Sequence, residues 1–199
     1  MLTGEVEAPA LADELHRHNA SLDIVTAHDL PALTKAAEKF ESGTRLLSFC
    51  TPVIVPRHVL EALPGPAYNF HPGPPERPGR YPSVFALYDG SPRFGITVHE
   101  MVPKVDSGAI VAAEWFDIPK DCDLMELESL TLVQLIKTFR RFAPYLATFS
   151  LPLPHHGIHW QGRKTTKADC MALCQLTPDM NPEEIARRRR CCGIHLPEF

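Results

Sequence analysis

Residues 45–55 read RLLSFCTPVIV, a stretch that is almost wholly apolar. Such a run predicts a strand buried on both faces of a parallel sheet, since helices cover both faces of sheets of that kind. Helical spacing precedes it over residues 31–40, and a short helix over residues 58–63 separates it from a second strand over residues 67–70. This alternation predicts an α/β fold, with functional groups at the carboxyl ends of the strands.

The rest of the chain continues this alternation between helical and strand-like spacing of apolar residues. Apolar side chains at helical spacing predict helices, and short alternating or β-branched runs predict strands. In chain order, the further predicted elements are a helix over 9–18, a strand over 22–27, a helix from 83 to 88, strands over 94–101 and 108–116, a helix over 124–149 and a helix after Asn181.

Composition excludes several classes of protein. The 199 residues are 44% hydrophobic and 22% charged, which is the balance of a globular domain with a buried core. The 20 prolines, ten of them from Pro52 to Pro92, exclude one long helical bundle. A net charge of −4 argues against a chain built to neutralise nucleic acid or anionic lipid. With no run of about 18 apolar residues and no signal peptide, we expect a cytoplasmic protein without membrane contact.

The six cysteines could form disulfides, but reduced thiols are the expectation for a chain of this length without a secretory signal. A zinc site is the alternative, since Cys170 and Cys174 lie four apart, Cys191 and Cys192 are adjacent, and three histidines lie upstream at 155, 156 and 159. The spacing departs from the usual pair of C-x2-C ligands, so we predict no metal.

Three polar residues stand among apolar or proline-fixed neighbours. Asn69 closes a predicted strand, His71 follows on the same face of the extended chain, and Asp106 lies between two later strands. An amide and an imidazole can donate to an oxyanion while a carboxylate orients the imidazole, which suits acyl transfer. No G-x-S-x-G elbow supplies a protein nucleophile, so the nucleophile is expected to be the substrate. Each residue alone also has a structural explanation as a cap, a packed histidine or a turn.

Two linked stretches resemble one known family. They are Tyr68-Asn-Phe-His-Pro-Gly and Phe94-Gly-Ile-Thr-Val-His-Glu-Met-Val-Pro-Lys-Val-Asp-Ser-Gly-Ala-Ile-Val. Together they are similar to the signature of the 10-formyltetrahydrofolate-dependent formyltransferases, which include methionyl-tRNA, glycinamide ribonucleotide and sugar N-formyltransferases. The likeness covers roughly residues 22–150. It implies a Rossmann-like formyltransferase fold, a mostly parallel sheet flanked by helices, with a catalytic domain over 1–150 and a packed extension over 151–199 ending in a short helix.

The resemblance also implies roles for particular residues. Asn69 would polarise the formyl oxygen, His71 would stabilise the oxyanion or move protons, and Asp106 would hold His71 and help to deprotonate the attacking amine. Two segments would bind the pterin of 10-formyltetrahydrofolate with apolar walls and main-chain groups. Their residues are Thr51, Pro52, Val53, Ile54, Val55, Val102, Pro103 and Val105.

The chain departs from the family pattern at its start and after His71. Asn69 comes early, so we expect an N-terminally shortened sheet without the first βαβ portion, whose exposed edge invites self-association. The loop after His71 carries Arg77, Arg80 and Tyr81, which we predict to meet an anionic part of the acceptor. A C-terminal barrel of the kind that helps to hold tRNA is not expected, so a small amine is preferred over nucleic acid.

Five functions therefore stay open at this point. The first is formyl transfer to a small-molecule or nucleotide-sugar amine. The second is hydrolysis of formyltetrahydrofolate, with water in place of the amine, and the third is a methionyl-tRNA formyltransferase-like activity. The fourth is a noncatalytic folate-binding protein that keeps the same three residues, and the last is a zinc-binding interaction module.

Overall fold

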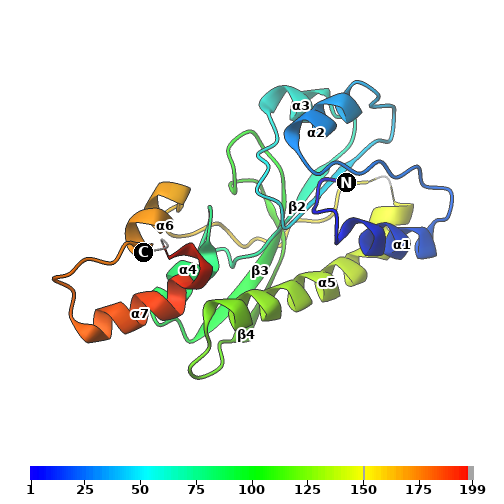
Figure 1. Cartoon of the computed structure of the whole chain (residues 1–199). Coiled ribbons are helices and arrows are strands. Elements are labelled where there is room, and N and C mark those ends of the chain that lie inside the picture. Colours follow the sequence, from blue (N-terminus) through cyan, green and yellow to red (C-terminus); the bar gives the residue numbers. More distant parts are fainter. Residues whose placement is uncertain (150, 197–199) are drawn as a thin grey trace.

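A four-stranded sheet forms the centre of the protein in this computed structural model, which describes residues 1–149 and 151–196. The strands lie side by side in chain order, and Figure 1 labels β2, β3 and β4 of this sheet. They are β1 (Leu46–Phe49), β2 (Ala67–His71), β3 (Arg93–Glu100) and β4 (Ile110–Asp117). Helices pack on this sheet, so the predicted α/β class is confirmed.

The sheet is mixed rather than mostly parallel. Strands β1 and β2 pair in parallel, whereas β2 with β3 and β3 with β4 are antiparallel. Residues 101–109, which join β3 to β4, are too few for the crossover that a parallel pair requires. The expectation of parallel pairing therefore holds for the N-terminal side of the sheet and is wrong for its C-terminal half.

The first three residues extend the parallel side of the sheet. Leu2 lies beside β1, where its N–H donates to Leu47 O at 2.8 Å and its carbonyl accepts from Phe49 N at 2.9 Å. On its other side, Leu2 bridges Ala27 in parallel, which is all that forms of the strand expected over residues 22–27. Leu2, the first helix and Ala27 thus form a narrow β-α-β unit beside the sheet, and the expected N-terminal shortening stays a prediction.

Seven α-helices and one 3₁₀ turn accompany the described strands. They are α1 (Ala8–His18), α2 (Leu30–Ala37), α3 (Arg57–Ala62), α4 (Pro82–Tyr88), α5 (Leu124–Thr148), α6 (Lys167–Cys174), α7 (Pro182–Cys192) and the 3₁₀ turn Gly193–His195. Six of these helices were predicted, and α6 was not. The capping box of Thr166 and Asp169 begins α6, and that Thr-x-x-Asp pattern was a signal available in the sequence. Within the described part of the chain, no helix is both long enough and apolar enough to cross a membrane.

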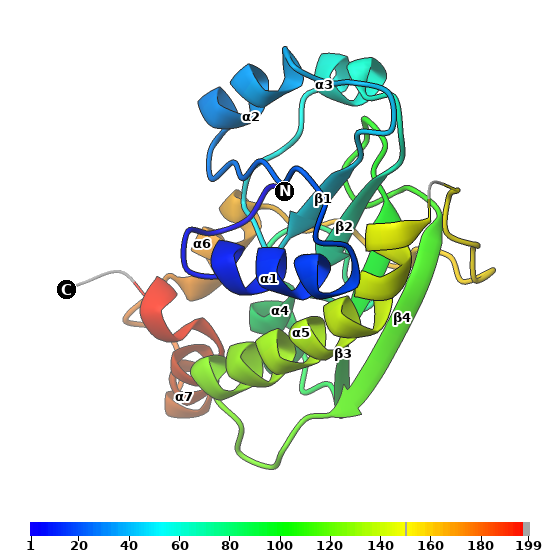
Figure 2. The same cartoon turned by 90° about the vertical axis from the view of Figure 1, so that its right-hand side faces the viewer.

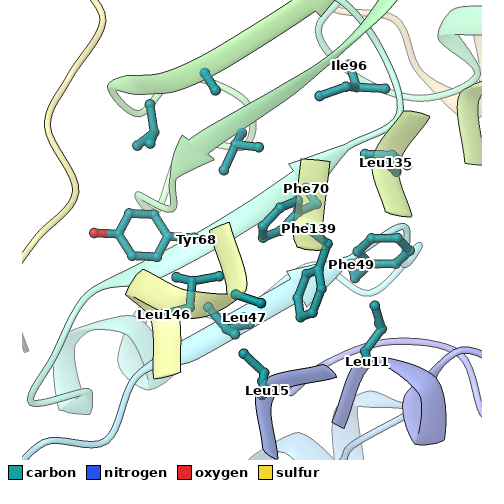
Figure 3. Close-up of a cluster of buried hydrophobic side chains, with 14 of the residues drawn as sticks. Leu11, Leu15, Leu47, Phe49, Tyr68, Phe70, Ile96, Leu135, Phe139 and Leu146 are labelled. Atoms are coloured by element: carbon teal, nitrogen blue, oxygen red, sulfur yellow. The ribbon is translucent and has the colours of Figure 1, made fainter. Parts of the chain in front are cut away.

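The main hydrophobic core lies between one face of the sheet and the pair α1 and α5. Figure 2 shows these two helices in front of the strands, and Figure 3 shows their side chains meeting those of β1 and β2. Phe139 of α5 contacts the rings of Phe49 and Phe70, with centroids 5.8 and 5.2 Å apart. These fully buried rings fix the position of β1 and β2, whose ends carry the predicted site.

A second core joins α4, α6 and α7 at the other end of the sheet (Figure 1). Cys174 and Cys192 are disulfide-bonded there, with Cα atoms 5.5 Å apart, while Cys170 and Cys191 are buried free thiols beside them. The expectation of reduced thiols is therefore wrong for this pair. Sequence spacing could not show it, because the packing of α6 against α7 brings the two cysteines together.

Candidate functional site

A cavity of about 530 Å³ opens at the carboxyl ends of β1 and β2. Its walls come from the loop over residues 50–55 after β1, the end of β2, residues 79–83 at the start of α4, and the inner face of α5. Carboxyl ends of parallel strands are the usual ligand site of α/β sheets, and this volume is typical of small-molecule sites. The predicted location of the site is thus where the cavity lies.

Asn69, His71 and Asp106 all line this cavity and lie close together. The imidazole Nδ1 of His71 is 3.8 Å from Asp106 Oδ2. Asn69 and Asp106 both face a second imidazole, that of His99, whose Nε2 lies 3.1 Å from Asn69 Nδ2 and 3.4 Å from Asp106 Oδ1. Residues 37 positions apart in sequence therefore meet in one polar cluster.

His99 is the residue that sequence reasoning did not single out. It lies directly opposite Asn69 in the antiparallel pair of β2 and β3, so both side chains point to the same face of the sheet. Its Nδ1 is 2.7 Å from the Glu100 carbonyl, to which it donates. The proton on Nε2 decides its other partner, since an unprotonated nitrogen accepts from the Asn69 amide and a protonated one donates to Asp106. The β2–β3 register was the missing information.

His71 is held as a neutral imidazole. Its side chain is buried, and its Nε2 donates to the main-chain carbonyl of Arg77 at 3.2 Å. Burial lowers the pKa of His71, the nearby His99 lowers it further, and the carboxylate of Asp106 only partly offsets both. At neutral pH, Nδ1 is therefore free to accept a proton on the side that faces Asp106.

Asp106 is a carboxylate over the whole physiological range. Burial by itself would raise its pKa, but the hydrogen bond from His99, the charges of the two imidazoles and the N–H of Gly79 lower it to about 2. The Gly79 N–H donates to Asp106 Oδ2 at 2.7 Å. A buried carboxylate with this pKa is suited to stabilising a charged imidazole and poorly suited to keeping a proton itself.

Three residues around the cavity have backbone angles that non-glycine residues rarely adopt. Among the described residues, the positive φ values outside glycine belong to Cys50 (46°), Tyr81 (60°), Asp106 (45°) and Asp121. The first three line the cavity. Such conformations concentrate at functional sites, where the surrounding structure holds a side chain in a required direction.

The loop expected to bind the pterin forms one wall of the cavity. Thr51, Pro52, Val53, Ile54 and Val55 all line it, as does Val105. Ile54 is 59% exposed although apolar, and the main-chain N–H groups of Thr51, Ile54 and Val55 have no main-chain partner in the described chain. Apolar walls with available donors fit a flat heterocycle. Val102 and Pro103, which were expected on the opposite side, are not among the lining residues.

The three residues expected to meet the acceptor are placed differently from one another. Arg80 and Tyr81 line the cavity. Arg77 lies outside it, where its guanidinium pairs with Asp89 at 2.8 Å and donates to Ser91 Oγ at 2.8 Å. The interpretation of Arg77 as an acceptor contact is therefore not supported by its position, because its charge is already paired.

The cavity wall also includes the thiol of Cys50, the residue that follows β1. Cys50 is exposed as a whole residue, yet desolvation of its thiol, together with the charges of Glu7 and Glu128, raises the pKa of Cys50 to about 11. A protonated thiol is a poor nucleophile, which agrees with the expectation that the substrate supplies the attacking group. Within residues 1–149 and 151–196, no cluster of three or more His, Cys, Asp or Glu side chains is arranged to hold a metal ion.

Comparison with protein families finds a match over residues 11–135 to the model described as "Formyl transferase". Among curated proteins, the dTDP-4-amino-4,6-dideoxyglucose formyltransferase of Mycobacterium tuberculosis is 31% identical over 121 residues, which are 56% of this chain and 50% of that protein. This chain thus spans about half the length of the curated relatives that it matches.

Solved structures show the same fold. A sugar N-formyltransferase from a Shewanella species superposes with a TM-score of 0.78 at 16% identity, covering 100% of this chain and 88% of that one. An N-formyltransferase from Helicobacter canadensis, solved with folinic acid and dTDP-3-aminofucose, has a TM-score of 0.73 at 14% identity and covers 100% and 82% of the two chains. The formyltransferase fold expected from the resemblance is confirmed.

Proposed function

The chain belongs to the formyl transferase family, and on that premise we propose that it transfers a formyl group from 10-formyltetrahydrofolate to the amine of a small molecule. The preferred acceptor is an amine on a nucleotide-linked sugar. One observation carries this proposal: an amide, two imidazoles and a carboxylate converge on one cavity beside an apolar loop with available main-chain donors. Residues 1–150 act as the catalytic domain and 151–199 as its extension, although residues 150 and 197–199 lie outside those described.

The formyl donor fits the wall made by residues 51–55. The side chains of Pro52, Val53 and Ile54 supply apolar contact for a pterin, and the main-chain groups of this loop supply its hydrogen bonds. When bound, 10-formyltetrahydrofolate supplies a carbonyl carbon that an amine can attack. Every other part of the chemistry is assigned to side chains of this chain.

Asn69 donates a hydrogen bond to the carbonyl oxygen of the formyl group. When His99 Nε2 carries no proton, it accepts one N–H of the Asn69 amide at 3.1 Å, which leaves the second N–H available to the oxygen on which negative charge develops. Because His99 fixes the amide, the donor is in place before the charge forms. Loss of one donor of this kind typically costs about 10²–10³ in rate.

His71 takes the proton that the attacking amine must lose, and its imidazolium returns that proton to the folate nitrogen when the bond from the formyl carbon to that nitrogen breaks and tetrahydrofolate leaves. Its low pKa keeps Nδ1 unprotonated, and the carboxylate of Asp106, 3.8 Å away, stabilises the imidazolium that results. Asp106 therefore acts through His71 rather than as a base of its own. In this proposal His71 is the base and Asp106 stabilises its charged form, whereas the resemblance implied that Asp106 also helps to deprotonate the amine.

The acceptor lies in the remaining part of the cavity. Arg80 and Tyr81 are there, and Arg80 supplies a positive charge for a phosphate or another anion. A relative with half of its length matched acts on a dTDP-linked amino sugar, which supports this acceptor class. A cytoplasmic location, self-association and the absence of a tRNA acceptor stay predictions.

The decisive experiment supplies 10-formyltetrahydrofolate with and without dTDP-4-amino-4,6-dideoxyglucose as the probe acceptor. We expect release of tetrahydrofolate that depends on the amine and is lost in His71→Ala. Formate release without any amine would instead favour the hydrolase, and activity confined to charged methionyl-tRNA would favour the tRNA-directed enzyme. Binding of folinic acid with no turnover of the formyl donor by any amine would favour a noncatalytic folate-binding protein.

A further inference from the structure

Residues 160–165, which we call the strap, cross the loop over residues 75–80 that follows β2. The N–H of Gln161 donates to Pro75 O at 2.9 Å, and the N–H of Arg80 donates to Thr165 O at 2.9 Å. Thr165 N in turn donates to Pro78 O at 3.1 Å. The strap comes from the C-terminal extension, beyond the matched family region of residues 11–135.

Two glycines allow the strap and the loop to approach so closely. A side chain on Gly79, whose φ is +99°, would place its Cβ 2.2 Å from Thr165 O. A side chain on Gly162, whose φ is +71°, would place its Cβ 2.4 Å from Glu76 O. Both positions combine a left-handed backbone with a main-chain neighbour that cannot move aside, so the contact depends on glycine on both segments.

Trp160 at the start of the strap lies against both imidazoles of the site. Its ring meets His99 edge to face with centroids 4.9 Å apart, and meets His71 in the same manner at 5.6 Å. The indole Nε1 donates to Gly108 O at 2.9 Å, which fixes the ring. Trp160 itself does not line the cavity.

The other end of the strap reaches the carboxylate indirectly. Thr165 holds the main chain on either side of Gly79, and the Gly79 N–H donates to Asp106 Oδ2. Lys164 adds a hydrogen bond from Nζ to the carbonyl of Val105, the residue before Asp106. The strap thus touches the two imidazoles directly and the carboxylate through one main-chain group.

We propose that the strap is a positioning element of the catalytic site, in which Trp160 fixes His71 and His99 and keeps water from them while Thr165 holds Gly79 against Asp106. This inference rests on the proposed formyl transfer. It assigns to the C-terminal extension a part in the chemistry, since the side chains of the catalytic domain depend on it for their orientation.

Water exclusion by Trp160 has a measurable consequence for His71. The groups that face its imidazole are Asp106, His99, the Arg77 carbonyl and the Trp160 ring. Burial is the largest cause of its lowered pKa, so removal of the indole admits water and raises that pKa toward its usual value of 6.5. If neutral His71 accepts the proton, the acidic limb of the pH–rate profile moves to higher pH.

The test compares Trp160→Ala and Trp160→Phe with Trp115→Phe. Trp115 is a matched control because its indole Nε1 also donates, to Glu76, while its ring lies beneath Arg93. We expect Trp160→Ala to lower kcat at least about tenfold, by displacing the catalytic groups, with both KM values within about twofold of wild type. The acidic limb of the pH–rate profile of Trp160→Ala should move to higher pH. Trp160→Phe keeps an aromatic ring at this position, so its kcat should lie between those of wild type and Trp160→Ala. Trp115→Phe should have the kcat and the pH–rate profile of wild type.

Histidine ring proton NMR of the same variants needs no substrate. Two imidazole signals that carry the ring-current shift of the indole should move in Trp160→Ala, and the one assigned to His71 should titrate at higher pH. Unchanged histidine signals and an unchanged kcat in Trp160→Ala would overturn the proposal. If the wild type transfers no formyl group to any amine, the proposed function fails, and the NMR titration still decides whether the strap positions the two histidines. If Trp160→Ala does not fold, the same NMR and kcat measurements on Trp160→Phe test the proposal.

Discussion

Replacement of Asp106 by asparagine removes the charge at the centre of the site while keeping its shape. The carboxylate accepts from Gly79 N at 2.7 Å and lies 3.4 Å from His99 Nε2 and 3.8 Å from His71 Nδ1. These partners lower its pKa from 3.8 to about 2, which sets an upper limit of about 2 kcal/mol of stability, because part of the lowering comes from the charge of His71, which is neutral at pH 7. Asp106→Asn should therefore lose unfolding free energy at pH 7, by no more than about that amount.

The sign of the pH dependence follows from the depressed pKa. Above pH 3.8, the ionised carboxylate stabilises the fold, and this contribution is lost as the pH falls from 3.8 through about 2. The gap between wild type and Asp106→Asn in urea unfolding, followed by tryptophan fluorescence, should therefore be full at pH 7 and close in that acidic window. Asp117→Asn at the exposed end of β4 is the control and should leave stability unchanged.

The same variant should lower the rate of formyl transfer, because the imidazolium of His71 loses its counter-charge. A loss of about 10²-fold or more in kcat is expected for a group that supports proton transfer in this way. Equal stability of Asp106→Asn and wild type across the whole pH range would refute the electrostatic reasoning, even if activity fell.

Three further variants test other parts of the structure. Cys174→Ser should lower the unfolding free energy by about 3 kcal/mol in oxidised protein and by much less in reductant, as judged by urea unfolding, and an equal loss in both conditions would contradict the disulfide. Phe139→Ala, which removes the ring between α5 and the sheet, should lower the unfolding free energy by about 3–5 kcal/mol in the same assay. A loss below about 1 kcal/mol would contradict the importance of this ring for the core. His99→Ala should lower kcat about tenfold or more by freeing the Asn69 amide, with folinic acid affinity unchanged in calorimetry; wild-type kcat would remove His99 from the site.

Much of the fold could be predicted because its signals are local. The helical period of α5 and the alternation of β3 are properties of consecutive residues, and both elements formed within a residue or two of the predicted bounds. The pairing of Asn69 with His71 was equally local, since residues two apart on a strand share a face. The strand expected over residues 45–55 stopped at Phe49, because the chain turns at Cys50 with a φ of 46°.

What could not be predicted depends on contacts between distant segments. His99 became a site residue only through the β2–β3 register, which sets it opposite Asn69. Trp160 lies among polar and proline residues with no period, and its role appears only when the strap is packed on the loop over residues 75–80. Arg77 was predicted to lie in the site and does not, because the sequence does not show that its charge is already paired with Asp89.

Turnover in one variant tests most directly whether the cavity at the ends of β1 and β2 transfers a formyl group, as we propose. Tetrahydrofolate release from 10-formyltetrahydrofolate should depend on an added amino sugar nucleotide in wild type. In His71→Ala it should fall by at least about 10²-fold while folinic acid still binds. Undiminished amine-dependent release by His71→Ala, with folinic acid bound as tightly as by wild type, would contradict the assignment of this site.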